Sequence, residues 1–510
     1  MISSGFLLRP CKNFIKQSYK HNWIKPDGFE TGIQVYNCIT EGKTPLILKN
    51  KQLITWYTCG PTVYDTSHIG HACCYVKLDV IQRILKSYFK YNIVMVMNIT
   101  DIDDKIIYKA NQTNTLYKDV ATRYEKEFLK DLQDLGVTEP NIILRVTENI
   151  ELIIDFIKKL EDGGQAYKAK DNSVYFDVKH YNNYGKLQNI GDQMIQQEQN
   201  DFKKSSADFA LWKGSKKGEP FWHSPWGTGR PGWHIECSAL ASHILGSNID
   251  IHAGGLDLRF PHHENEEAQS CAYHKTNQWV NYWLHTGHLH LKSAEKMSKS
   301  LKNTISIQEM LKIATPDVFR LSCLMSHYRS NVEYSKELLE TAENLLKVYK
   351  NLLNSCDDYK KGYLKATINT EILTQALNDA YDNIHRSLCD DFDTPAVIKC
   401  LNDLVSVTNS MLHATVSSNS DGGLYTVMGV ANFVSNTLSM FGINFESKTH
   451  TSQDFTEIMD ILNTFRQNVR LIGVANKDQE VLKLCDNVRI RLRHLGIDIK
   501  DHAKASSWSR

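Results

Sequence analysis

Two short motifs that lie far apart in the chain constrain its fold most strongly. The first, His-Ile-Gly-His, occupies residues 68–71, and the second, Lys-Met-Ser-Lys-Ser, occupies residues 296–300. Before the first motif, the apolar, β-rich run 53–58 leads into a turn at Gly60, and a helical pattern of apolar residues follows the motif. Unpaired backbone N–H groups and the dipole at a helix N-terminus favour phosphate. We therefore predict an open α/β fold that binds a phosphate-bearing ligand at this turn.

The residue types in the two motifs suit the transfer of a nucleotide to a carboxylate. When a carboxylate attacks the α-phosphate of ATP, negative charge grows at phosphorus, and positioned donors must meet it there. The imidazoles of His68 and His71 can do so from one side. The ammonium groups of Lys296 and Lys299 can do so from the other, while Gly70 leaves room for the adenine ring. Either motif alone could be a chance match or a solvated loop, but in this order they resemble those of the class I aminoacyl-tRNA synthetases.

Length and composition bound the architecture. With 510 residues the chain is long enough for about three or four modules with ample cores. The formal net charge is +1, so contacts with nucleic acid must come from local basic patches. No apolar run approaches the roughly 20 residues that span a bilayer, and we expect no membrane association. Twelve cysteines without a close Cys-X-X-Cys spacing argue against a disulfide framework.

The N-terminal segment has a different composition from the rest of the chain. Its first 26 residues contain five Lys or Arg, several serines and scattered apolar residues, but no Asp or Glu. This composition resembles a mitochondrial transit peptide, and the alternative is a basic disordered tail. We predict that residues 1–30 form a leader and that the protein belongs in the mitochondrial matrix.

Four further motifs make the resemblance more specific. They are CGPTVYD from Cys59, NITDIDDKI at 98–106, GRPGWHIECS at 229–238 and FPHHENE at 260–266. Together with the first two motifs, they strongly resemble the cysteinyl-tRNA synthetase family, from about Gly32 to the C-terminus. The leader favours a mitochondrial form.

The resemblance implies a set of ligand-binding residues. In that family a Zn²⁺ ion is held by residues that match Cys59, Cys237, His262 and Glu266. All four are common zinc ligand types, and the last two are four apart, which places them on one face if the segment is helical. The resemblance also places Trp233, with Cys59, in the amino-acid pocket. It places two further residues near the adenylate, His252 and Asp257.

Other histidines of the same region could be ligands, phosphate donors or ordinary core or surface residues: 234, 243, 263, 285, 288 and 290. A metal would explain how the site separates cysteine from serine. A substrate thiolate is a soft anionic ligand, whereas a serine hydroxyl is a poor one. We therefore expect direct coordination of the substrate sulfur and no editing domain.

The order of patterns along the chain predicts an interrupted Rossmann-like domain with a parallel sheet, followed by helices. A Tyr-, Asn- and Gln-rich stretch interrupts the domain, and sheet patterns return at 209–212 and 249–252. The predicted first catalytic half spans 31–144, and a connective insertion that contacts the tRNA acceptor end spans 145–205. The second catalytic half spans 206–290. The KMSKS loop with stem-contact helices spans 291–362, and a helical anticodon-binding domain spans 363–510.

The C-terminal residues carry a local excess of positive charge. Within 461–510 there are ten Lys and Arg against five Asp and Glu, which supplies affinity for phosphate. Trp508 could stack on an unpaired anticodon base, or it could anchor the tail in an apolar contact.

We interpret the chain as an enzyme that activates L-cysteine with ATP and Mg²⁺ and transfers it to tRNA(Cys), acting as a monomer. One rival is a related ligase that passes cysteine to an amino sugar, which should lack an anticodon module. Another is pyridoxal phosphate-dependent persulfide production, but here the spacing of Lys105 and Lys109 departs from that pattern. A third is a degenerate tRNA-binding regulator, which conflicts with the presence of every signature residue.

Overall fold

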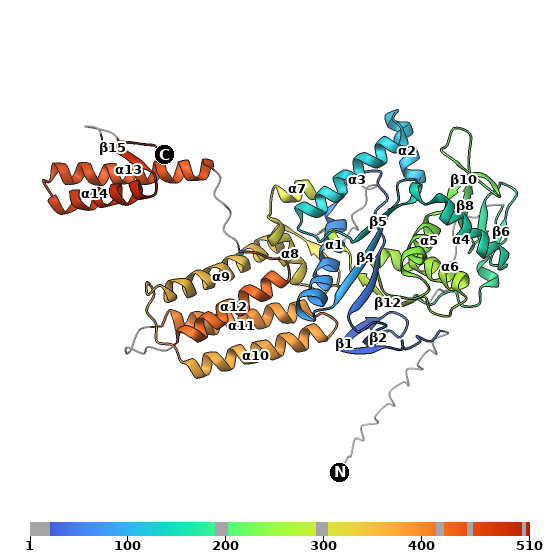
Figure 1. The fold of residues 1–510 in the computed structure, drawn as a ribbon, viewed down its shortest axis with the longest axis horizontal. Coiled ribbons are helices and arrows are strands. Elements are labelled where there is room, and N and C mark those ends of the chain that lie inside the picture. The colour runs from blue at the N-terminus through green and yellow to red at the C-terminus, as the bar shows by residue number, and fades with distance from the viewer. Residues whose placement is uncertain are drawn as a thin grey trace, which may run out of the picture. The chain divides into compact units, whose positions relative to one another are not determined.

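The computed structural model describes residues 21–188, 202–291, 304–414, 423–445, 452–501 and 506–509 (Figure 1). The chain divides into two compact units, Met1–Asn444 and Phe445–Arg510. The KMSKS motif and the first 20 residues, which make up most of the predicted leader, lie outside the described residues.

A five-stranded parallel sheet forms the centre of the first unit. Its strands are β3 (Leu53–Thr58), β4 (Asn92–Ile99), β5 (Ile142–Arg145), β11 (Ile249–Gly255) and β12 (Val280–Thr286), in the order β12-β11-β3-β4-β5. The predicted strand 53–58 is confirmed with the same bounds. The strand order reverses between β3 and β11, and ligands of open α/β sheets bind at the carboxyl ends beside such a reversal. The Rossmann-like fold is therefore confirmed.

Buried hydrogen bonds fix the register of β3 against β11. The Asp250 carboxylate accepts from the backbone N–H and the hydroxyl of Thr55, at 2.9 and 2.8 Å, and the Thr55 hydroxyl accepts from the Asp250 N–H at 2.9 Å. Asp250 is buried. A slip of one residue would leave this carboxylate without its donors, which is costly in a buried place.

Helices connect the parallel strands. α1 (Ile69–Arg83) joins β3 to β4, α2 (Asp104–Thr113) and α3 (Tyr117–Asp134) join β4 to β5, and α6 (Glu264–His274) joins β11 to β12. Parallel crossovers are right-handed. Because β4 lies on one side of β3 and β12 lies on the other side of β11, α1 and α6 cover opposite faces of the sheet. The helix predicted after His68 is confirmed.

A second sheet is inserted between β5 and α5 (Trp233–Leu245), and α4 (Ile150–Asp162) packs beside it. Its five strands are antiparallel, in the order β6-β7-β8-β10-β9. Their bounds are Ala166–Lys168 for β6, Val174–Phe176 for β7, Phe209–Gly214 for β8, Trp222–Ser224 for β9 and Gly227–Pro231 for β10.

The strand predicted at 209–212 is thus present, but it pairs with the inserted strand β7 and not with the parallel sheet. An apolar run looks the same in either sheet. The sequence pattern therefore placed the end of the insertion too early, at residue 205. Gly232 forms the return: an added Cβ there would lie 2.0 Å from the Ala210 carbonyl oxygen. The inserted sheet therefore meets the first turn of α5 without space between them.

The remaining elements of the first unit precede or follow the strands of the parallel sheet in the chain. A hairpin of β1 (Phe29–Asn37) and β2 (Gly42–Leu48) precedes it, and β13 (Leu289–Leu291) pairs with β14 (Val332–Tyr334). The helices that follow are α7 (Ile307–Leu311), α8 (Pro316–Leu324), α9 (Lys336–Lys360), α10 (Thr370–Cys389), α11 (Thr394–Leu412) and α12 (Leu424–Met440). The last four pack together as a bundle.

The second unit consists of α13 (Ser452–Ala475), α14 (Gln479–His494) and a hairpin of β15 (Asp498–Asp501) and β16 (Ser506–Ser509). The predicted helical C-terminal region is confirmed, but it also contains this hairpin, which was not predicted. The predicted module 363–510 also contains parts of both compact units. Within the described part of the chain, no helix is both long and apolar enough to cross a bilayer.

A buried arginine joins α1, α8 and the bundle. The Arg320 guanidinium donates to Asp79 on α1 at 2.5 Å and to the carbonyl oxygens of Leu135, Gly136 and Phe441 at 3.1, 2.9 and 3.2 Å. Burial would raise the pKa of the Asp79 carboxyl, but the guanidinium groups of Arg320 and Arg83 hold it below its usual range. The helix that carries the first motif is thereby fixed at its far end.

We expect the Arg320→Met variant to lose about 3–5 kcal/mol of the free energy of unfolding, because the buried Asp79 carboxylate loses its main partner. Urea unfolding measures the loss, with Lys336→Met as control, since Lys336 is an exposed residue of α9. A loss within about 0.5 kcal/mol of the control would contradict the role assigned to Arg320.

Candidate active site and metal centre

A cavity of about 400 Å³ opens at the carboxyl ends of the central parallel strands. Its walls come from the end of β3 and the following turn, the first turns of α1, and the loops after β11 and β12. The first part of α2, two residues of α3 and the first residue of α5 complete it. The cavity therefore lies where the strand order reverses, as expected for a ligand site of this fold.

Gly60 shapes the turn between β3 and α1. Its N–H donates to the Asn98 side chain at 2.9 Å, and an added Cβ would lie 1.7 Å from the Asn98 carbonyl oxygen. Only glycine permits this approach of the turn to β4. The turn is thereby held beside the sheet, and the N-terminus of α1 faces the cavity.

The two histidines of the first motif cap α1. His68 is the N-cap residue, and its Nδ1 accepts from the Gly70 N–H at 3.1 Å, while His71 Nδ1 accepts from the His68 N–H at 3.4 Å. The rings stack with centroids 3.8 Å apart. Because each Nδ1 is an acceptor, the proton of each neutral ring is on Nε2. Gly70 and both histidines line the cavity.

The residues just after the second motif lie beside the first. The N–H of Ile69 donates to the carbonyl of Ile305 at 3.0 Å, and the N–H of Ile307 donates to the carbonyl of Ser67 at 3.2 Å. Lys296 and Lys299 themselves lie outside the described residues. These bonds bring the chain that follows the KMSKS motif to the start of α1.

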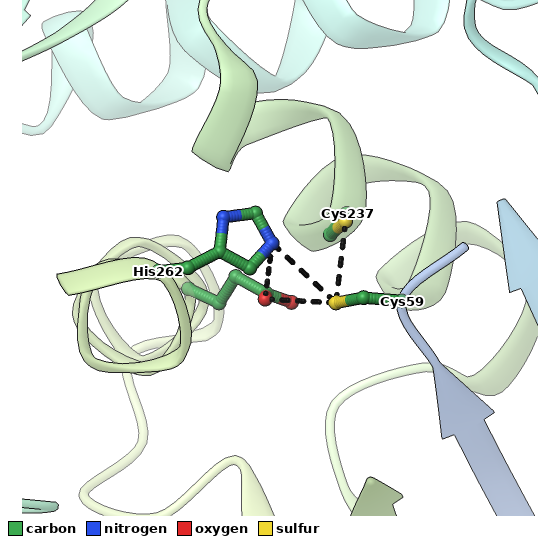
Figure 2. A group of neighbouring side chains, drawn as sticks. Cys59, Cys237 and His262 are labelled. Carbon is green, nitrogen blue, oxygen red and sulfur yellow. Dashed lines mark hydrogen bonds and ion pairs between the residues drawn. The ribbon is translucent and has the colours of Figure 1, made fainter. Parts of the chain in front are cut away.

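The four predicted metal ligands converge on one buried point (Figure 2). Cys59 directly follows β3, Cys237 lies on α5, His262 lies in the turn before α6, and Glu266 lies on α6. Cys59 Sγ is 3.6 Å from Cys237 Sγ, 3.4 Å from His262 Nε2 and 3.3 Å from Glu266 Oε1. His262 Nε2 is 3.0 Å from the same Glu266 oxygen. Four ligand atoms at these separations could hold a metal ion.

Without a bound cation, protons on the thiol and imidazole groups balance the negative charges of the cluster. Burial raises the pKa of the Cys59 thiol well above its usual range. Burial also opposes ionisation of Cys237, but hydrogen bonding with Cys59 and the neighbouring His262 bring the pKa of that thiol to about 6. Glu266 and Cys237, acting against burial, raise the pKa of His262 to about 10. A cation could replace the proton on His262, because it would stabilise the same anions.

Three neighbouring histidines surround the cluster. His252 Nε2 is 2.9 Å from Glu266 Oε2, the oxygen that does not face Cys59, and His234 Nδ1 is 2.9 Å from His262 Nδ1. His263 Nδ1 is 2.9 Å from His285 Nε2. Outer partners of this kind orient metal ligands. A second possible ligand set replaces Cys237 and His262 with His252 and His263, but in that set the His263 Nε2 to Glu266 Oε1 distance is 4.0 Å.

The cluster adjoins the cavity at Cys59 and Trp233. Both line the cavity, and the Trp233 ring lies over His262 with centroids 4.2 Å apart. Asp257, predicted near the adenylate, also lines the cavity. His252 does not: its ring is fully buried against Trp283, and its role in ATP binding stays a prediction.

Tyr64 and Lys105 are among the cavity residues that were not assigned to the site from the sequence. The Lys105 ammonium lies 5.3 Å from the centre of the Tyr64 ring. Both belong to quoted motifs, CGPTVYD and NITDIDDKI, and this was the available signal. Lys109 lies 3.8 Å from the Asp65 carboxylate and does not line the cavity.

Trp508 lies in the terminal hairpin of the second unit. It pairs with Ile499, its indole N–H donates to Asp460 at 2.8 Å, and its ring lies 6.0 Å from that of Phe455. These contacts fit an anchoring role, and the stacking of Trp508 on RNA stays a prediction.

Comparison with known proteins identifies the family. The family model for the tRNA synthetases class I (C) catalytic domain matches residues 46–344. A Xenopus tropicalis protein named "Probable cysteine--tRNA ligase, mitochondrial" is 41% identical, over 95% of this chain and 91% of its own. This chain belongs to the cysteine–tRNA ligase family. The cytoplasmic cysteine–tRNA ligase of Dictyostelium discoideum is 39% identical over 95% of this chain and 79% of its own.

The fold extends to more distant class I enzymes. Mycobacterium tuberculosis methionyl-tRNA synthetase, solved with methionyl-adenylate, matches with a TM-score of 0.55 at 14% sequence identity. The match covers 77% of this chain and 90% of the other. This likeness concerns the fold alone and agrees with the parallel sheet described above.

We expect Cys237→Ser to lower the affinity of this family member for a divalent metal by at least about 100-fold, because one of four converging ligands becomes a weak one. Titration with Co²⁺ and with Zn²⁺ measures the affinity. Cys400→Ser, a change at a partly exposed cysteine of the bundle, is the matched control. Equal affinities of the two variants would contradict the assignment of the cluster.

Proposed function

We propose that this cysteine–tRNA ligase family member condenses L-cysteine with ATP to cysteinyl-adenylate and pyrophosphate, and then transfers cysteine to the terminal ribose of tRNA(Cys). The observation that carries this proposal is the position of the buried cluster. It meets the nucleotide cavity at Cys59 and Trp233, so an amino acid held there would present its carboxylate toward the histidines of α1.

The chain's own residues would accelerate the first step mainly by position and charge. His68 and His71 keep their Nδ1 atoms as acceptors within the helix cap, so each Nε2–H can donate to the α-phosphate as charge develops. Lys296 and Lys299 would neutralise the departing pyrophosphate, and Mg²⁺ would accompany ATP. Gly70, Asp257 and His252 are the proposed adenosine contacts.

The cluster fits zinc in chemistry and in spacing. Around a tetrahedral zinc with Zn–S near 2.3 Å and Zn–N near 2.0 Å, two sulfurs lie about 3.8 Å apart and a sulfur and a nitrogen about 3.5 Å. The corresponding separations here, Cys59 to Cys237 and Cys59 to His262, are 3.6 and 3.4 Å. Zinc held by these residues would accept a substrate thiolate as a further ligand and would leave a serine hydroxyl poorly bound. Trp233 would close the pocket over the substrate.

The other regions have proposed roles in binding tRNA. The inserted sheet adjoins the cavity through Gly232 and α5, which suits contact with the acceptor end. The second unit carries most of the C-terminal excess of Lys and Arg, which suits contact with the phosphates of the anticodon arm. The relative from Xenopus tropicalis is named as mitochondrial. Together with the first 26 residues, which contain no Asp or Glu, this supports a matrix location, and we propose that the protein acts there as a monomer.

ATP–pyrophosphate exchange by the full-length, zinc-loaded protein tests the proposal. We expect exchange that depends on cysteine, with serine at least about 100-fold less effective, because the pocket is built to bind the thiolate. Cys237→Ser should lose exchange while Cys400→Ser keeps it. No cysteine-dependent exchange by folded, metal-loaded protein would rule out the synthetase reaction.

A second variant isolates the donor role of the first motif. In His71→Asn the side-chain oxygen can replace Nδ1 as the acceptor of the helix cap, but the Nε2 donor is lost. We expect the exchange rate to fall by about 10²–10³-fold with little change in the thermal midpoint. Unfolding and exchange would be measured on the same sample. A rate within about threefold of the parent would show that His71 only caps the helix.

A further inference from the structure

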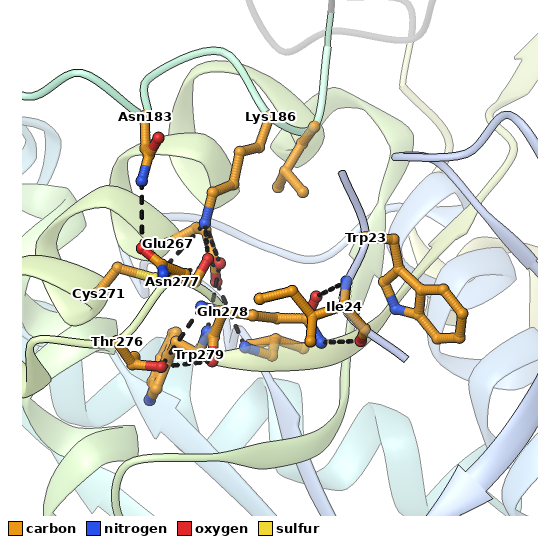
Figure 3. A network of polar contacts seen from close by, with 12 residues as sticks. Trp23, Ile24, Asn183, Lys186, Glu267, Cys271, Thr276, Asn277, Gln278 and Trp279 are labelled. Atoms are coloured by element: carbon orange, nitrogen blue, oxygen red, sulfur yellow. Dashed lines mark hydrogen bonds and ion pairs between the residues drawn. The ribbon is translucent and has the colours of Figure 1, made fainter. Parts of the chain in front are cut away.

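The residues just before β1 lie along the outer edge of the parallel sheet. β12 is the last strand in the order β12-β11-β3-β4-β5. The edge of a sheet presents backbone N–H and C=O groups that need partners. Residues 23–25, which we call the N-terminal strap, supply one such partner through the Trp23 indole. Figure 3 shows Trp23, and Ile24 bonded to Gln278, the residue two before β12.

The strap is bound mainly through polar atoms. The N–H of Ile24 donates to Gln278 Oε1 at 2.9 Å, and Gln278 Nε2 donates to the carbonyl of Ile24 at 2.9 Å. The Gln278 side-chain amide thus pairs with the backbone N–H and C=O of Ile24, as the backbone of a neighbouring strand would. The Trp23 indole N–H donates to the carbonyl oxygen of Asn281, on β12 itself, at 3.0 Å.

Further contacts hold the side chains that bond to the strap. With the strap in place, Gln278 is 9% exposed and Asn281 is 3% exposed. The side-chain amides of Asn281 and Asn248 bond to each other at 3.0 and 3.1 Å. The Trp23 ring lies 5.9 Å from that of Tyr282 and packs on the apolar cluster that contains Trp279. Polar and apolar contacts together therefore hold the strap against β12.

The strand that the strap covers also serves the active site. The carboxyl end of β12 supplies Thr286 and the loop after it to the cavity. At its other end, the Glu267 carboxylate accepts from the N–H groups of Trp279 and Val280, both at 3.3 Å. Glu267 follows the metal-ligand candidate Glu266 on α6. Loss of the strap would therefore loosen a strand shared by both parts of the site.

We propose that the strap is a permanent part of the catalytic unit and that proteolytic removal of the leader stops before Trp23. The predicted leader 1–30 is then limited to residues 1–22. The processing part rests on the proposed mitochondrial location, whereas the structural part does not.

Point variants of the full chain test the structural part. Ile24→Pro removes the donated N–H, whereas Ile24→Ala keeps it and shortens a side chain that is 49% exposed. We expect Ile24→Pro to lower the thermal midpoint by at least about 3 °C and Ile24→Ala to change it by less than about 1 °C. In a Gln278→Leu background the effect of Ile24→Pro should largely vanish, because the partner is gone. Equal midpoints of the Pro and Ala variants would overturn the structural part.

Import into isolated mitochondria tests the processing part. The N-terminus of the imported protein, read by mass spectrometry, should fall at or before Trp23. A mature protein that starts after Trp23 would overturn the processing part. Failure of import would overturn the proposed location and the processing part together, while the comparison of thermal midpoints still decides whether the strap belongs to the folded unit.

Discussion

The pairing of β3 with β11 is the constraint on which the site depends. Thr55 and Asp250 are 195 residues apart in sequence, yet their mutual hydrogen bonds fix the register of the two strands. Because Thr58 lies opposite Ala253, that register sets Cys59, which follows β3, beside the end of β11. The other three residues of the candidate metal cluster come from α5, α6 and the turn before α6. The pairing of β3 with β11 therefore brings the two parts of the cluster together beside the cavity.

Burial of four ionisable groups in one cluster is unfavourable unless their charges are balanced. The shifts at Cys237, His262 and Glu266 show how strongly these groups interact. A thiolate and a carboxylate that share one imidazolium are suited to exchange that proton for a cation. Metal binding and correct packing of α5 against α6 should therefore reinforce each other.

Much of this arrangement could be predicted from the sequence. The strand 53–58, the helix after the first motif and the Rossmann-like class followed from periodicity and turn residues. The four residues that converge in the cluster were named from the family motifs, and their binding of a metal stays a prediction. The sheet to which 209–212 belongs could not be predicted, because an apolar run pairs equally well in the parallel sheet and in the inserted antiparallel sheet. The partners of His234, His252 and Arg320 were also inaccessible, since each depends on the distance between segments that are remote in the chain.

The return from the inserted sheet has a mechanical consequence. Pro231 ends β10, Gly232 packs against the Ala210 carbonyl, and Trp233 begins α5. No linker separates the insertion from Trp233, which lines the cavity. A displacement of the inserted sheet would thus be transmitted to the indole that lies over His262. A molecule bound to the surface of the insertion could in this way change the shape of the cavity.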